Sequence, residues 1–322
     1  MAGYVTGAGN QLQSDGVWDY VYDDESNLKT QTHKTTGEYR EYSWDHRNRL
    51  TQVEIYASSG GALQKTLSFI YDVLDRRIGY SVDGMTRWTV YGRANAWLDV
   101  DDAATVQTRY LFSKKLDSQL ARWRPGEGTV WYLKDKLGSV RHLVDADGNL
   151  LGNYHYDSFG NINQTASSAL DGRYLFTGRE YDEILGVYYY RSRYYNPSIG
   201  RFLSRDSMGF DAGDINLYRY VDNNPLIFTD PTGNAVAIEY SVTNINSKGT
   251  VSISVRIIGN RAGQSLIKVG DTIAKSGGTI SFGGGSAGAA GTFSFGSGAI
   301  AGSGAAAGGG AAATAAASTL AF

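Results

Sequence analysis

Apolar and polar residues alternate in short runs along most of the first 172 residues, and Asp, Asn and Gly separate these runs. The run Leu50–Tyr56 reads Leu-Thr-Gln-Val-Glu-Ile-Tyr, and Tyr154–Tyr156 has the same period of two. This period is typical of a half-buried β-strand, because successive side chains point to opposite faces of a sheet. Asp and Asn bond the local backbone and Gly accepts positive φ, so the intervening residues predict tight turns. The pattern therefore predicts a series of antiparallel β-hairpins.

An aromatic residue followed by Asp recurs in two stretches of the chain, residues 22–72 and 133–182, with steps of roughly 22 to 27 residues within each. The copies are Tyr22-Asp23, Trp44-Asp45, Tyr71-Asp72, Tyr156-Asp157 and Tyr181-Asp182, with a weaker copy at Leu133-Lys134-Asp135. One hairpin alone is marginal in water, so we expect neighbouring hairpins to stack edge to edge and bury their tyrosines in one curved sheet. The aromatic residues before Asp should then hold equivalent positions. Alternatively, exposed tyrosines line a groove that binds carbohydrate.

Composition narrows the chemistry that the chain can perform. Its 322 residues are 19% charged with a net charge of −2, so no strong field attracts nucleic acid or anionic lipid. The absence of cysteine excludes disulfides, thiolate zinc sites and cysteine nucleophiles. No two of the histidines have the spacing of a metal-ligand pair; they are His33, His46, His142 and His155. We therefore predict no metal and no cofactor.

The composition changes after Asn234 and again near Gly277. Alternating residues in 236–242 and 251–257 predict a hairpin, and Leu266–Val269 predicts a third strand. No Asp, Glu, Lys or Arg occurs from Ser276 to Phe322, where Gly and Ala dominate, so we expect low-complexity sequence without regular structure. A membrane-inserting hairpin of small residues is the alternative there. The opening residues contain no signal peptide, which indicates a fragment of a longer chain.

Six motifs follow one another between residues 173 and 234. They are Arg173-Tyr-Leu-Phe-Thr-Gly-Arg-Glu-Tyr-Asp182, Gly186-Val-Tyr-Tyr-Tyr-Arg-Ser-Arg-Tyr-Tyr-Asn-Pro197, Gly200-Arg-Phe-Leu-Ser-Arg-Asp206, Asn216-Leu-Tyr-Arg-Tyr220, Asn223-Asn-Pro225 and Asp230-Pro-Thr-Gly233. With the hairpins before them, these motifs resemble the C-terminal end of Rhs and teneurin-type YD-repeat proteins over about residues 15–234. The resemblance and the pattern together predict a mainly β protein. Its expected parts are YD-type hairpins (1–172), the Rhs repeat-associated core domain (173–234), a variable β-rich tail (235–280) and a Gly/Ala-rich segment (281–322).

The resemblance implies a hollow β-shell whose core module closes one end. In the toxin-delivering branch of the family, that module is also an aspartyl self-protease that cuts just past its second Asp-Pro-x-Gly element. Carried over to this chain, the resemblance implies Asp206 and Asp230 as the catalytic carboxylates, Arg205 beside them, and a cut after Asn234. Ser207 and Asn234 stand where the family usually has proline and leucine.

Two carboxylates within reach of one water share a proton, so one serves as base and the other as acid. Alternatively, Asp206 and Asp230 only cap turns, since Asp before Pro or Ser and followed by Gly is common turn sequence.

Two functions follow. The first is a secreted or cell-surface shell of the polymorphic-toxin type, which encloses its own C-terminal segment and whose one enzymatic activity is self-cleavage. Its partners would be that segment and the rest of a longer YD-repeat chain, not nucleic acid. The alternative is an adhesion protein without catalytic activity that binds cell-surface glycans. The tail shows no nuclease, deaminase or glycohydrolase motif.

Overall fold

A computed structural model describes residues 3–92, 95–113, 117–165, 172–212 and 214–234. Beyond them it describes the backbone of 236–245, 251–259, 278–282, 291–296 and 299–303. The chain divides into two compact units, Met1–Ala235 and Val236–Phe322. None of the residues described forms a helix that is long and apolar enough to cross a membrane.

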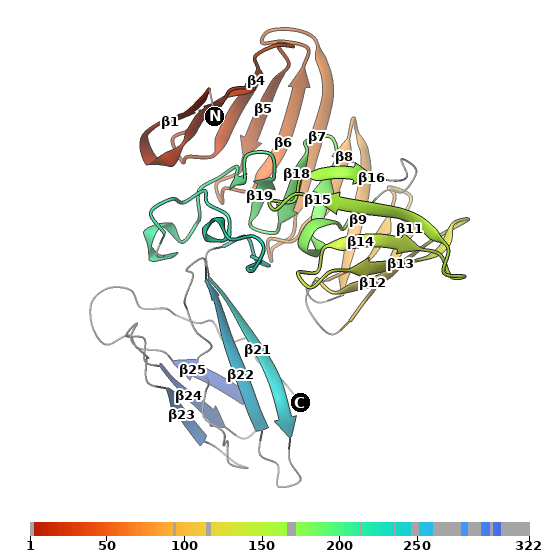
Figure 1. Cartoon of the computed structure of the whole chain (residues 1–322), viewed down its shortest axis with the longest axis vertical. Helices are drawn as coiled ribbons and strands as arrows, with labels where there is room; N and C mark the ends of the chain where they lie inside the picture. Colours follow the sequence, from red (N-terminus) through yellow and green to blue (C-terminus); the bar gives the residue numbers. More distant parts are fainter. Residues whose placement is uncertain are drawn as a thin grey trace. The chain divides into compact units, whose positions relative to one another are not determined.

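The first unit contains a sheet of 16 antiparallel strands, whose order in space is their order in the sequence. The strands are β1 (Tyr4–Thr6), β2 (Leu12–Asp15), β3 (Trp18–Tyr22), β4 (Leu28–His33), β5 (Tyr39–Trp44), β6 (Leu50–Tyr56), β7 (Leu63–Tyr71), β8 (Arg77–Val82), β9 (Met85–Gly92), β10 (Asn95–Val100), β11 (Val106–Phe112), β12 (Gln119–Arg124), β13 (Gly128–Lys134), β14 (Val140–Val144), β15 (Leu150–Tyr156) and β16 (Ile162–Thr165). Figure 1 shows that this sheet is strongly curved. The prediction of a mainly β fold built from consecutive hairpins is confirmed.

The aromatic-Asp pairs end strands in the same way. Tyr22, Trp44, Tyr71 and Tyr156 are the last residues of β3, β5, β7 and β15, and a β-bulge precedes each of them. The Asp that follows then shapes the turn. In one copy, Oδ1 of Asp72 accepts hydrogen bonds from the amides two and four residues later, both at 2.9 Å. The residue three positions after each such Asp has positive φ, as Asp75 (φ 62°) does here.

Each aromatic side chain also reaches back to the previous hairpin. The indole nitrogen of Trp44 donates to the carbonyl of Leu28 at 2.7 Å, and the Tyr71 hydroxyl donates to that of Leu50 at 2.8 Å. The same contact joins Tyr91 to Arg77 and Tyr156 to Val140. Each acceptor is the first residue of the strand that returns from the preceding turn, so consecutive repeats are tied together by side chains as well as by the sheet.

The core motifs form a second, four-stranded sheet: β17 (Glu180–Asp182), β18 (Val187–Tyr190), β19 (Arg193–Asn196) and β20 (Arg201–Phe202). The 3-10 turns η3 (Gly209–Ala212) and η4 (Val221–Asn223) follow the last strand of this sheet, while η1 (Ala8–Asn10) and η2 (Phe176–Gly178) lie before its first strand. In Figure 1, β18 and β19 lie on the concave side of the curved sheet, between its two arms.

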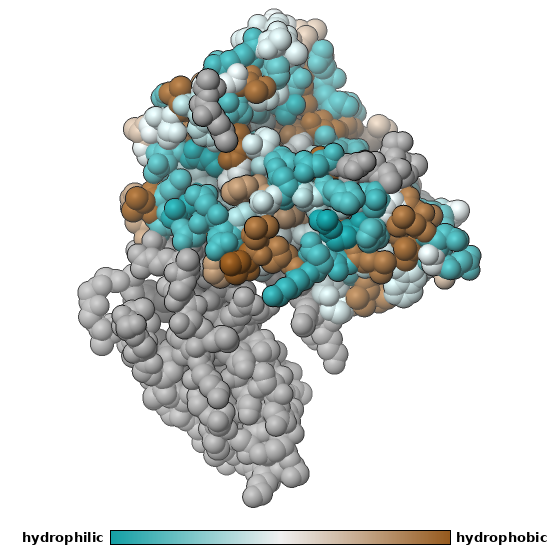
Figure 2. All heavy atoms as spheres, in the orientation of Figure 1, coloured by the Kyte–Doolittle hydropathy of each residue, from teal (hydrophilic) through white to brown (hydrophobic). Residues whose placement is uncertain are grey.

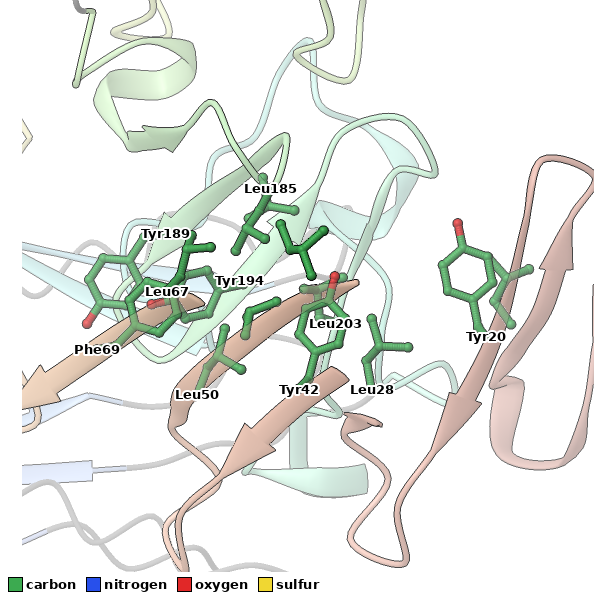
Figure 3. Close-up of a cluster of buried hydrophobic side chains, with 14 residues drawn as sticks. Tyr20, Leu28, Tyr42, Leu50, Leu67, Phe69, Leu185, Tyr189, Tyr194 and Leu203 are labelled. Carbon is green, nitrogen blue, oxygen red and sulfur yellow. The ribbon is translucent and has the colours of Figure 1, made fainter. Parts of the chain in front are cut away.

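Both faces of the hairpin β18–β19 are buried. Tyr189 and Tyr194 pack with Leu67 and Phe69 of the curved sheet, as Figure 3 shows. On the opposite face, Tyr188, Tyr190 and Tyr195 pack in a second cluster with residues of β13–β15. Tyrosines therefore pack on both faces of this hairpin, because it lies inside the curved sheet and is covered from both sides.

The repeat tyrosines are also inside. Those that point into the core are 5–6% exposed: Tyr20, Tyr42, Tyr110, Tyr132 and Tyr154. These rings therefore do not form the exposed stacking surface that the carbohydrate-binding alternative requires of them. On the outer surface, Figure 2 shows brown groups among the teal where Figure 1 places β11–β13, and the exposed apolar side chains of those strands include Leu111, Leu120 and Leu133.

In the second unit, β21 (Val236–Ile245) pairs with β22 (Val251–Gly259) as the sequence pattern predicts. The expected strand at 266–269 lies outside the described residues. The Gly/Ala-rich region contains a three-stranded sheet of β23 (Gly278–Phe282), β24 (Gly291–Gly296) and β25 (Ala299–Ser303), contrary to the expectation of no regular structure. Alternation around isolated Ile and Phe residues explains these short strands.

Candidate active site

Asp206 and Asp230 are brought together at the edge of the core module. Asp206 follows β20 and its amide donates to the carbonyl of Leu217 at 2.9 Å, which fixes the start of the next loop. Asp230 opens the Asp-Pro-Thr-Gly element 24 residues later in the sequence. Each residue is 3% exposed. A buried carboxylate is costly unless it is paired, so the partner of these two residues defines the site.

That partner is Arg193, the first residue of β19. Its Nη2 lies 2.8 Å from Oδ2 of Asp206 and 3.7 Å from Oδ2 of Asp230. Its guanidinium carbon lies 3.7 Å from the centre of the Phe202 ring, which covers the charged group. The two carboxylates thus flank one guanidinium nitrogen.

Arg205, the residue that the resemblance placed beside the carboxylates, is exposed. It lies after the end of β20, lines the same cavity as Asp206, and forms no ion pair with Asp206 or Asp230 among the described residues. The arginine between the carboxylates is Arg193.

The two oxygens of each carboxylate have different environments. Oδ1 of Asp206 accepts a hydrogen bond from the amide of Met208 at 2.9 Å, and Oδ1 of Asp230 accepts one from the amide of Gly233 at 2.9 Å. The turn-capping role therefore exists for both residues. Oδ2 of both carboxylates is buried, faces Arg193 and accepts no aligned hydrogen bond. Turn capping occupies one oxygen of each group and leaves the other directed into the site.

Burial raises the pKa of Asp230 to about 6, against the opposing effect of Arg193. Burial also shifts the pKa of Arg193, which it lowers, and the negative charges of the two carboxylates oppose this lowering. Two ionised carboxylates around one guanidinium would leave a net buried negative charge. A proton on Asp230 removes that charge, so the site is suited to hold one acid and one base.

The turn between β18 and β19 holds the chain just before Asn234. Arg191 donates to the carbonyl of Pro231, the amide of Ser192 donates to that of Thr232 at 3.2 Å, and Nε of Arg193 donates to that of Gly233. Three consecutive residues of the turn thus bind three consecutive carbonyls. Gly233 has φ 73°, and a Cβ there would overlap the carbonyl oxygen of Tyr190, so only glycine fits this close approach.

Ser207 and Asn234, the two residues that differ from the family pattern, contact each other. Ser207 Oγ donates to Oδ1 of Asn234 at 3.2 Å, and Nδ2 of Asn234 donates to Oγ of Ser192 at 2.9 Å. Where the family's leucine would need apolar neighbours, this chain provides two hydroxyl groups for the amide of Asn234. The side chain at this position is therefore matched to its surroundings.

The site opens onto a cavity of about 1020 Å³ in the first unit. Arg191, Arg193, Asp206 and Asn234 line one side, and turn residues of the curved sheet, including Arg47–Arg49, line another. Asn234, the last described residue of the first unit, is therefore part of the wall of this cavity. Within the described ranges, no group of three or more His, Asp or Glu side chains is placed to hold a metal ion.

A family model described as "Teneurin YD-shell" matches residues 55–226. The chain is 32% identical over 202 residues to a tRNA3(Ser)-specific nuclease WapA of Bacillus spizizenii, covering 61% of this chain and 8% of that protein. It is 29% identical over 234 residues to the toxin subunit YenC1 of Yersinia entomophaga, covering 66% and 24%. A crystal structure of TcdB2-TccC3-TEV superposes with a TM-score of 0.51 at 20% identity, over 70% of this chain and 13% of that one, which shows a shared fold. The chain thus spans less than a quarter of the length of each of these proteins.

Proposed function

Because the chain belongs to the teneurin YD-shell family, we propose that it is the C-terminal part of a YD-repeat shell that encloses its own C-terminal segment and frees it by cutting after Asn234. The core module, residues 173–234, is the closing plug of this shell, and the residues from 235 onward are the enclosed segment. The relatives named as a nuclease and a toxin subunit support a shell of the polymorphic-toxin type, which would be secreted or displayed at the cell surface.

The observation that carries the proposal is the placement of two buried carboxylates around Arg193, beside the clamped residues 231–234. Asp206, paired with Arg193 at 2.8 Å, acts as the base that takes a proton from water. Asp230, whose pKa is raised to about 6, acts as the acid that protonates the peptide oxygen. Water then supplies the hydroxyl of the new carboxyl group, and the nitrogen of residue 235 leaves with a proton.

Arg193 has two functions in this proposal. Its Nη2 pairs with Oδ2 of Asp206, and its Nε holds the carbonyl of Gly233, in the peptide unit directly before the bond to be cut. One side chain thus links the reacting carboxylate to the substrate segment. This arrangement fixes the distance between them, which is the main requirement for an intramolecular cut.

The test is the intact mass of the full-length parent protein after expression. We expect two fragments that separate after Asn234 in the wild type and one uncut chain in Asp206→Asn and Asp230→Asn. Asparagine keeps the Oδ1 acceptor that caps each turn, so both variants retain the turn but lose the acid or base. Asp145→Asn is the matched control, since Asp145 caps an exposed turn through Oδ1 at 2.9 Å and lies outside the site.

An uncut wild-type parent would refute the proposal. Cleavage that persists in both aspartate variants would refute the assigned chemistry, because Asp206 and Asp230 would then be turn residues only.

A further inference from the structure

Arg191 connects the wall of the curved sheet to the segment before the proposed cut. It occupies the turn between β18 and β19 with φ 63°. Its guanidinium donates to both carboxylate oxygens of Asp117, at 2.6 and 3.1 Å, and also to the carbonyl of Pro231. Asp117 belongs to the curved sheet, two residues before β12 begins. Three parts of the chain that are distant in sequence therefore meet at one side chain.

Asp117 is itself held in place by a second arginine. Nη1 of Arg179, whose side chain is 5% exposed, lies 2.6 Å from Oδ1 of Asp117. Arg179 also donates to the carbonyl of Tyr189 in β18 at 2.9 Å. Asp117 is thus clamped between two guanidinium groups of the core module, and its own side chain is 14% exposed. Because Asp117 binds the guanidinium of Arg191 through both of its carboxylate oxygens, it fixes the plane of that guanidinium.

We propose that Asp117 and Arg191 are positioning residues for the self-cleavage, which they support only when the β11–β12 part of the wall is in place. This inference rests on the proposed function. The side chain of Arg191 is more exposed than that of Arg193, at 27% against 3%, so without Asp117 it would be free to leave the Pro231 carbonyl for solvent. The segment 231–234 would then lose the first of its three carbonyl contacts with the turn 191–193 and move relative to the carboxylates.

Self-cleavage would then depend on correct docking of the core module on the wall. Asp206, Asp230 and Arg193 all come from residues 193–230, so the reacting groups lie within the core module itself. Asp117 comes from the wall. A core module that has not docked on the wall would therefore carry its carboxylates but hold the segment loosely, and it would not cut. Cleavage would report that the shell around the segment is complete.

The experiment compares Asp117→Asn, Asp117→Glu and Arg191→Gln in the full-length chain. Arg191→Gln leaves the pair of Arg179 and Asp117 intact, so it separates loss of positioning from loss of wall packing. The control is Asp45→Asn, because Asp45 is similarly shielded (18%) and pairs with Arg49 at 2.6 Å, but it has no contact with the turn 191–193. Cleavage is followed by mass against time and pH, and hydrogen exchange is measured on the peptide that covers residues 230–234.

In Asp117→Asn and Arg191→Gln we expect cleavage to slow by about ten- to a hundredfold, as for a small displacement of reacting groups. The pH at which cleavage falls by half should not move, since neither residue contacts the carboxylates, and amides in 230–234 should exchange faster. Asp117→Glu keeps a carboxylate, so it should retain most of the wild-type rate of cleavage. Asp45→Asn should match the wild type.

Unchanged cleavage and unchanged exchange in both Asp117→Asn and Arg191→Gln would overturn this inference while leaving the proposed function standing. If the wild type is not cut at all, the proposed function fails, and exchange in 230–234 alone decides whether Asp117 and Arg191 hold the segment. A shifted pH profile would place Arg191 among the reacting groups and would also overturn the positioning role.

Discussion

Replacing Glu180 by Gln should loosen the contact between the core module and the curved sheet. Glu180, in β17, is fully enclosed by two arginines: Arg77 of the sheet at 2.7 Å and Arg173 at 3.0 Å. Arg173 in turn pairs with Asp99 of β10. Burial would raise the pKa of Glu180, but Arg173 and Arg77 hold it well below its usual range.

The expected cost follows from what the change leaves behind. Glutamine keeps the shape and an acceptor oxygen but removes the charge, so Arg77 loses its ion pair with Glu180 and Arg173 keeps its pair with Asp99. Breaking a buried ion pair by removing one partner costs about 3–5 kcal/mol. We expect the lower end, about 3 kcal/mol, because the acceptor remains. The matched control is Asp19→Asn, whose pair with Lys34 at 3.0 Å is exposed at 55% and 41% and should cost less than about 1 kcal/mol.

Native-state hydrogen exchange in the full-length chain measures this cost locally, on the amides of β17 and β18. A loss of about 3 kcal/mol corresponds to exchange more than about a hundredfold faster. The pKa of Glu180 is lower in the folded chain than its ordinary 4.5, so its contribution is present above pH 4.5 and is lost as pH falls through the folded value. Exchange in Glu180→Gln that stays within a factor of five of the wild type would refute the reasoning, since the arginines would then have found other partners.

Three further predictions concern the core module. Tyr189→Ala should destabilise the hairpin β18–β19 by about 3–5 kcal/mol in the same exchange measurement, because the ring is 2% exposed and packs on Tyr194 and Arg77; a loss below about 1 kcal/mol would contradict its burial. Gly233→Ala should prevent the cut, since a Cβ at φ 73° would overlap the Tyr190 carbonyl oxygen, and the intact mass of the parent chain checks this against Gly148→Ala, whose added Cβ would meet no neighbour. Self-cleavage should slow as pH rises through about 6, the pKa of Asp230, because the acid loses its proton; a rate that rises over this range would assign Asp230 the opposite role. Because that pKa lies above the ordinary 3.8, protonation of Asp230 also favours folding below pH 3.8, and this contribution is lost towards pH 6.

Much of the curved sheet was predictable because its information is local. The aromatic-Asp pairs mark the ends of β3, β5, β7 and β15, and Asp72 shows why: one carboxylate oxygen closes the turn through two amides. The bulge before each aromatic residue was not predicted, since an extra residue in a strand leaves no mark in an alternating pattern. Nor was the burial of both faces of β18–β19, which depends on where the core module docks.

The site was predictable only in part. Motif resemblance led to Asp206 and Asp230, and the structure brings both to Arg193. Resemblance pointed to Arg205, but this residue is exposed and Arg193 pairs with the carboxylates instead. Arg191, Ser192 and Arg193 stand within a run of tyrosines, where they read as strand and turn residues. Their carbonyl partners at 231–233 lie 40 residues later, and no periodicity links segments at that distance.

The hydrogen bonds from the repeat aromatic side chains to the preceding hairpin affect the order in which the curved sheet can fold. Trp44 binds Leu28, Tyr71 binds Leu50 and Tyr156 binds Val140, so each hairpin is fastened to residues that left the ribosome earlier. Every strand in β1–β16 pairs with its sequence neighbours, which keeps the loops to be closed short. The wall can thus grow in the order of translation, one hairpin at a time, without waiting for downstream sequence. The core module comes last, because Glu180 and Tyr194 need Arg77 already in place.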